Sequence, residues 1–154
     1  ALFVLLLAAA PAALAQQQMA DPDFRPTVAR PAYAGAGPVV GIDEGHANFH
    51  TLAGRYAPFA RLLAADGYTV RPSPGPVTSE VLAGLDVFVV ANARAAPGAE
   101  AGSAFSAAEI AALKAWVEAG GALLLISDHA PFGAAARGGL RVNVLKTGAV
   151  GVGT

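Results

Sequence analysis

The chain has 154 residues, which suits one domain and is too short for two independent hydrophobic cores. Hydrophobic residues make up 55% of it and charged residues only 14%, so the bulk of the chain is not expected to be disordered, and the net charge of −1 gives no support for a nucleic-acid partner. The absence of cysteine excludes disulfides, thiolate metal sites and a cysteine nucleophile.

Residues 1–15 are predicted to be part of a signal peptide. The segment is apolar throughout, and small residues at positions 13 and 15 precede three glutamines, as at a signal-peptide cleavage site. It is shorter than the roughly twenty residues of a membrane span, so no stable span is expected after cleavage. Because a start methionine and a basic region are missing, we expect the printed chain to begin inside the signal peptide. The protein is therefore predicted to be exported, to the periplasm or the medium.

Composition divides the rest of the chain into three parts. Residues 16–37 contain several X-Pro pairs, which favour extended backbone, and they are predicted to form a lead-in strapped over the domain. Residues 38–136 are predicted to form one α/β domain. Residues 137–154 have no acidic and no aromatic residue and lack the pattern of the preceding units. We expect them to be an irregular tail or a truncated region.

Strand and helix patterns alternate along the predicted domain. Apolar runs predict strands, and helical spacing with start and stop signals predicts the helices between them. The best helix start is Ser106, which forms a capping box with Glu109, and Gly120 ends that helix. The expected elements are a strand at 38–42, a helix at 56–65, a strand at 68–70, a turn at 72–76, a helix at 78–85, a strand at 86–91, a helix from 106 to 119 and a strand at 122–126.

Strands that are apolar throughout and separated by helices predict a parallel sheet covered on both faces. Right-handed connections then favour a three-layer doubly wound α/β fold of the flavodoxin-like kind, with strand order 2-1-3-4. In such a sheet, ligands bind beyond the carboxyl ends of the strands. All three histidines of the chain follow predicted strands. The candidate site residues are Asp43, Glu44, His46, Asn48 and His50 after the first strand, Asn92 and Arg94 after the third, and Asp128 and His129 after the fourth.

These side chains suit acid–base chemistry. His46 or His129 would act as a general base, and Asp43 or Asp128 would orient the imidazole. The remaining candidates, Glu44, Asn48, His50, Asn92 and Arg94, would bind the ligand. A structural alternative stays open, in which Asp43 caps the next turn, His50 packs beside Phe49 and Asp128 holds its loop.

A cofactor is not expected. A divalent metal ion such as zinc would suit imidazole and carboxylate groups, but their spacing matches no established ligand signature. No phosphate-binding glycine motif and no G-x-S-x-G elbow follows any predicted strand. Nucleotide binding and serine hydrolase chemistry by those mechanisms are therefore not supported.

Several segments resemble exported bacterial proteins of the DUF4350 family, which look like members of the class I glutamine amidotransferase-like superfamily. The resemblance covers about residues 20–136, and its most specific parts follow the first and fourth strands. It is carried by residues 42–51, 56–59, 66–68, 90–93 and 116–132.

The resemblance implies an amidotransferase-like fold without the amidotransferase chemistry. In glutaminases of that superfamily, a nucleophilic cysteine sits on the turn after the strand that matches 123–126. Here that turn reads Ser127, Asp128 and His129, so thiol-dependent glutamine hydrolysis is excluded. The superfamily's later histidine and acidic partners would follow residue 137, so we expect the domain to be incomplete at its C-terminus.

The sequence thus predicts an exported α/β domain with a hydrolase-like or ligand-binding site for a small molecule or carbohydrate. The alternative is a noncatalytic envelope module that recognises a sugar, a peptide or a protein partner. The two differ in the surroundings of the histidines. An imidazole bonded to a carboxylate in an open cleft favours catalysis, and side chains bonded only to backbone favour a scaffold.

Overall fold

The computed structural model describes residues 19–94 and 103–127, together with the backbone of residues 141–144 and 150–153. The predicted signal peptide, Asp128 and His129 lie outside the described residues. Within the described part of the chain, no helix has the length and hydrophobicity needed to cross a membrane.

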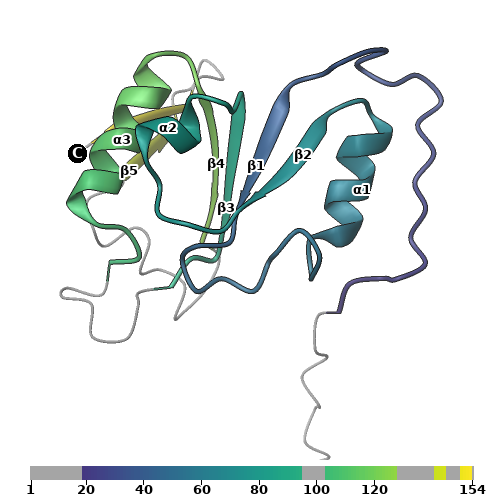
Figure 1. The fold of residues 1–154 in the computed structure, drawn as a ribbon, viewed down its shortest axis with the longest axis horizontal. Helices are drawn as coiled ribbons and strands as arrows, with labels where there is room; N and C mark the ends of the chain where they lie inside the picture. The colour runs from purple at the N-terminus through teal and green to yellow at the C-terminus, as the bar shows by residue number, and fades with distance from the viewer. Residues whose placement is uncertain (1–18, 95–102, 128–140, 145–149, 154) are drawn as a thin grey trace, which may run out of the picture.

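Four strands form one parallel sheet: β1 (Val39–Asp43), β2 (Thr69–Ser73), β3 (Val87–Ala91) and β4 (Ala122–Ile126). Their order is β2-β1-β3-β4, and every neighbouring pair runs parallel (Figure 1). This confirms the α/β class and the strand order predicted from the sequence. All four carboxyl ends therefore lie at one edge, which we call the carboxyl edge.

Helices cover both faces of the sheet, as a doubly wound fold requires. Helix α1 (Ala57–Ala65) lies on one side, and α2 (Ser79–Leu82) and α3 (Ala107–Glu118) lie on the other (Figure 1). Thr78 caps α2 by accepting a hydrogen bond from the Val81 backbone N–H. The predicted capping box of Ser106 and Glu109 is present at the start of α3.

The hydrophobic core has two halves that alternate along the strands. Val40, Ile42 and Val89 pack toward α1, and the intervening residues Phe88 and Val90 pack toward α2 and α3. Each of these side chains is no more than 2% exposed. The apolar runs of β1 and β3 are therefore explained by burial on both faces.

Two sheet features differ from the sequence prediction. Strand β2 continues through Pro72, where a turn was predicted, because its described partner is β1 alone and an edge strand tolerates the missing N–H of proline. The helices leave one face of β4 partly uncovered. Leu124 is 44% exposed there, because α1 packs over β1 and β3 and not over β4.

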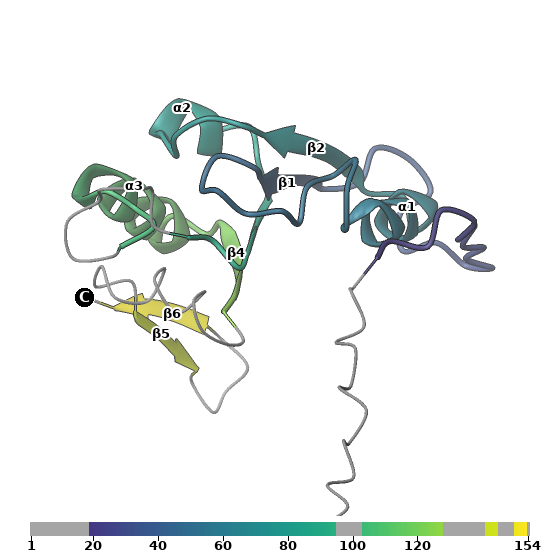
Figure 2. The same ribbon diagram turned by 90° about the horizontal axis from the view of Figure 1, so that it is seen from below.

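The region beyond residue 140, which was expected to be an irregular tail or a truncated region, contains two strands. Strands β5 (Arg141–Val144) and β6 (Val150–Gly153) pair antiparallel as a separate hairpin, which Figure 2 shows beside α3. Valines recur at every second position in both strands and pair in register. This period of two is the strand signal that the compositional argument overlooked.

Residues 19–37 contain no helix or strand and run along α1 (Figure 1). Ala32 donates its backbone N–H to the Asp66 carboxylate at 2.8 Å, and the Gly37 N–H donates to the Gly67 carbonyl at 3.2 Å. Gly67 has a φ of +94°, and a Cβ at this position would collide with the carbonyl of Tyr33. The lead-in is thus attached to the C-terminal end of α1.

Candidate functional site

Asp43 is the last residue of β1 and organises the loop that follows it. Its side chain is fully buried, and one carboxylate oxygen accepts from the Gly45 backbone N–H at 3.2 Å. The Asn48 amide donates to the other carboxylate oxygen at 3.0 Å and to the Asp43 carbonyl at 2.7 Å. Asp43 therefore folds the loop back over the end of its own strand.

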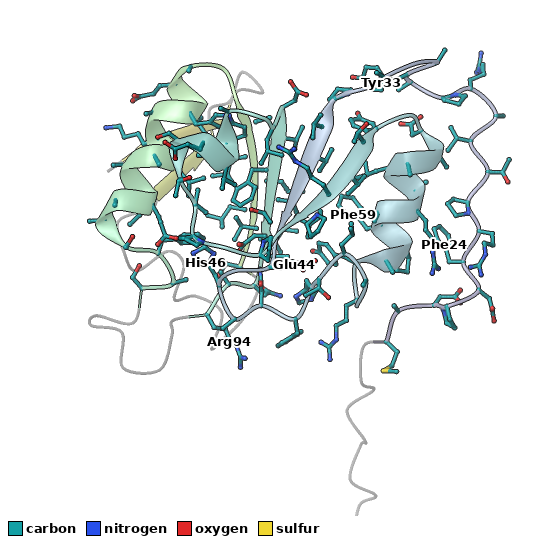
Figure 3. All side chains as sticks on the ribbon, in the orientation of Figure 1. Phe24, Tyr33, Glu44, His46, Phe59 and Arg94 are labelled. Atoms are coloured by element: carbon teal, nitrogen blue, oxygen red, sulfur yellow. The ribbon has the colours of Figure 1, made fainter. Side chains whose placement is uncertain are left out.

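His46 lies in this loop with both ring nitrogens bonded to carboxylates. Its Nδ1 lies 2.8 Å from Asp43 Oδ1, and its Nε2 lies 3.0 Å from Glu109 Oε1. Figure 3 shows His46 at the carboxyl edge, close to the start of α3. We call Asp43, His46 and Glu109 the inner cluster.

Glu109 was assigned to the capping box alone, and sequence reasoning missed its second role. Its Oε2 accepts from the Ser106 backbone and hydroxyl, both at 2.8 Å, while Oε1 accepts from His46 and from the Val77 backbone N–H. The topology of the predicted fold could have indicated this second role. A helix that follows a parallel strand begins at the carboxyl edge, so its capping carboxylate lies near the end of β1.

Contacts within and around the inner cluster shift the pKa values of His46 and Glu109. Burial opposes the cationic form of His46, but hydrogen bonds and charge attraction from Asp43 and then Glu109 outweigh it and raise the pKa above 6.5. For Glu109, burial favours the neutral acid. The bonds from Ser106, Val77 and His46 outweigh that effect and lower the pKa to about 2.

These surroundings favour the cationic form of His46. A ring nitrogen facing a carboxylate must donate a proton to it, and here both nitrogens face carboxylates. The His46 side chain is 7% exposed, and the ring centroid of Phe105 lies 4.1 Å from the imidazole. The sequence predicted that His46 and Asp43 would meet, and they do, within a buried cluster.

The other predicted residues of this loop contact groups within the loop or at the start of α1. Glu44 accepts a hydrogen bond from the Leu52 N–H at 2.7 Å, which places its carboxylate inside the loop. His50 is buried, with its ring 5.0 Å from both Phe49 and Tyr56. The Asn48 Oδ1 is buried, and none of the described residues donates a hydrogen bond to it.

Asn92 and Arg94 follow β3, and Arg94 contacts the same loop. The Arg94 backbone N–H donates to the His46 carbonyl at 2.9 Å, and its Nε donates to the Ala47 carbonyl at 3.0 Å. Ala47 and Asn92 both adopt left-handed backbone, with φ of +49° and +53°. Such conformations are uncommon for residues other than glycine and often occur at functional sites.

The described residues contain no group of three or more His, Asp or Glu side chains arranged to hold a metal ion. A pocket of about 350 Å³ lies beside the end of β2, lined by Arg71, Ser73, Glu80 and neighbouring residues. None of the predicted site residues lines this pocket.

Compared with protein-family models, curated proteins and solved structures, the chain matches none of them. The site must therefore be interpreted from its own geometry.

Proposed function

We propose that this domain is an exported, noncatalytic binding module that takes a small molecule or carbohydrate at the carboxyl edge of its sheet. The observation that carries the proposal is the commitment of both His46 nitrogens to carboxylates. This bonding of both nitrogens favours the binding alternative over the hydrolase-like one. The resemblance to amidotransferase-like proteins is compatible with it, because the chain has no cysteine to act as nucleophile.

A general base needs a lone pair that faces the substrate. Freeing one on His46 would require breaking a hydrogen bond to Asp43 or Glu109 and leaving a buried carboxylate without its cation. The loop around His46 is also closed, because Glu44 and Asn48 are bonded within it. The inner cluster is therefore suited to supporting a binding surface and not to moving protons.

NMR of the imidazole groups in the full chain tests this proposal. With ¹⁵N-labelled histidine, we expect the His46 imidazole to titrate above 6.5 and to carry protons on both ring nitrogens below its pKa. The His46→Gln variant assigns the signal. Glu109→Gln keeps an acceptor oxygen near Nε2 but removes its charge, so it should lower the His46 pKa.

Binding and turnover are then measured on the same protein with a panel of sugars and sugar acids. We expect chemical-shift changes at residues of the carboxyl edge and no conversion of any compound. A His46 pKa at or below 6.5, or conversion that disappears in His46→Gln, would overturn the proposal in favour of catalysis.

A further inference from the structure

Two arginines flank one partly exposed aromatic ring beside the inner cluster. The Arg55 guanidinium carbon lies 4.3 Å from the centroid of the Phe49 ring, and that of Arg94 lies 5.7 Å from the same centroid. Phe49 is 36% exposed. The two guanidinium groups come from different loops, the first after β1 and the second after β3. We call Arg55 and Arg94 the arginine pair.

The arginine pair carries positive charge that no carboxylate of the described residues matches. Within residues 19–94 and 103–127, neither arginine forms an ion pair. Two like charges held beside one ring repel each other. A bound anion would relieve this repulsion and would gain charge-assisted hydrogen bonds.

Arg94 is held in place in a way that leaves donors for a ligand. Its backbone N–H and its Nε are bonded to the carbonyls of His46 and Ala47, so the side chain is fixed at its base. The two Nη groups make no hydrogen bond with any described residue, and each carries two donors. Figure 3 shows Arg94 projecting outward from the carboxyl edge.

The loop that presents Phe49 and Arg55 is prearranged. Asp43 and His46 fix its first part, Glu44 fixes its middle at Leu52, and the left-handed Ala47 turns the chain between them. A site that is rigid before binding loses less entropy when a ligand arrives. The backbone strain at Ala47 and Asn92 also lies at this edge, as expected of a functional surface.

We propose that the arginine pair and Phe49 bind a sugar that carries an anionic group, either a carboxylate or a phosphate. The anion would accept hydrogen bonds from the guanidinium groups, whose planar geometry matches its oxygens. The exposed part of Phe49 would contact the less polar face of the sugar ring. This inference rests on the proposed binding function and specifies its ligand class.

The test titrates the full ¹⁵N-labelled chain with glucuronate, a hexose phosphate and glucose, and follows the backbone amides. We expect glucuronate, the hexose phosphate or both to shift the amides of residues 47–55 and Arg94, and glucose to have little effect. A response to one acid and not the other identifies the anionic group. Arg55→Gln should weaken binding about tenfold, the value of one charge-assisted hydrogen bond.

Arg30→Gln is the matched control, because it removes the same charge from an exposed position in the lead-in. It should leave the affinity unchanged. Equal binding of glucose and glucuronate would overturn the anionic class and leave the binding function standing. Absence of binding by both acids, or undiminished binding by Arg55→Gln, would overturn the inference. Conversion of a ligand would instead overturn the proposed noncatalytic function.

Discussion

The inner cluster and the arginine pair lie side by side at the carboxyl edge, yet they differ in almost every physical respect. His46 and Asp43 are at most 7% exposed, and their charges are matched by neighbouring groups. The arginine pair flanks an exposed ring and has no ion pair within the described ranges 19–94 and 103–127. One loop, the one after β1, contributes to both.

This difference shows that a polar residue at a strand end is not by itself a reactive one. Hydrogen bonds that are satisfied inside the protein stabilise it, and charges that remain unmatched are available to a ligand. The inner cluster should therefore respond to mutation through stability. The arginine pair should respond through binding.

The largest expected effect is that of Glu109→Ala. The variant leaves the His46 cation without one of its two carboxylates and removes the capping box, so the free energy of unfolding should fall by about 3–5 kcal/mol in chemical denaturation. Glu118→Ala on the same helix is the control. The Glu118 side chain is 64% exposed, and its carboxylate lies 4.0 Å from the Lys114 ammonium, which is a long distance for an ion pair. Its loss should therefore reduce the free energy of unfolding by less than about 0.5 kcal/mol. Equal effects of the two substitutions would contradict the assignment of the inner cluster as a structural unit.

The next effect is a pH dependence with two limbs. The pKa of Glu109 is lowered to about 2, so its stabilising contribution is present above 4.5 and is lost as the pH falls toward 2. The pKa of His46 is raised, so its contribution is present below 6.5 and is lost as the pH rises through the raised value.

Denaturation midpoints measured across the pH range should therefore be highest between about 4.5 and 6.5. On the acidic side, the free energy of unfolding should fall by about 3 kcal/mol as Glu109 becomes protonated. His46→Gln should flatten the alkaline limb, and an unchanged alkaline limb would show that another group produces it.

A smaller effect is expected at Ala47, whose left-handed backbone suits glycine. Ala47→Gly should stabilise the protein by about 0.5–1 kcal/mol, because the strain relieved exceeds the added entropy of the unfolded chain. Ala53 is exposed in the same loop and lies outside the left-handed region. Ala53→Gly should therefore destabilise by about 0.5 kcal/mol, and thermal unfolding of both variants checks the opposite signs.

The smallest effect on stability is expected for Arg55→Gln. Its contact with Phe49 and its repulsion from Arg94 act in opposite directions, so the net change should stay within about 0.5 kcal/mol. Chemical denaturation measures it. A loss above about 1.5 kcal/mol would place Arg55 with the structural residues and weaken its assignment to a ligand.

Most of the fold could be predicted because its signals are local. The capping box at Ser106, the glycine after α1 and the apolar runs each depend on neighbours in sequence, and each is present in the structure. Pro72 was predicted to lie in a turn, because a strand position at the edge of a sheet cannot be distinguished locally from one in the centre. The exposure of Leu124 depends on how far α1 extends over the sheet, which no local pattern encodes.

The position of these polar residues at the carboxyl edge was predictable, and their hydrogen-bond partners were not. Asp43 and His46 are three residues apart at the end of β1, so their contact is local in the sequence. The pairing of His46 with Glu109 joins positions 63 residues apart and depends on the exact placement of α3. Arg55 was missed because it lies in a turn before a helix and carries no sequence motif.

The attachment of the lead-in to α1 has a consequence for the order of folding. Its anchor, Asp66, is the C-cap of that helix, and the Gly67 carbonyl that receives the Gly37 N–H lies one residue beyond. Neither acceptor is correctly placed until the helix has formed and ended. The lead-in therefore docks late, and hydrogen exchange at the Ala32 and Gly37 amides would report its release separately from the unfolding of the sheet.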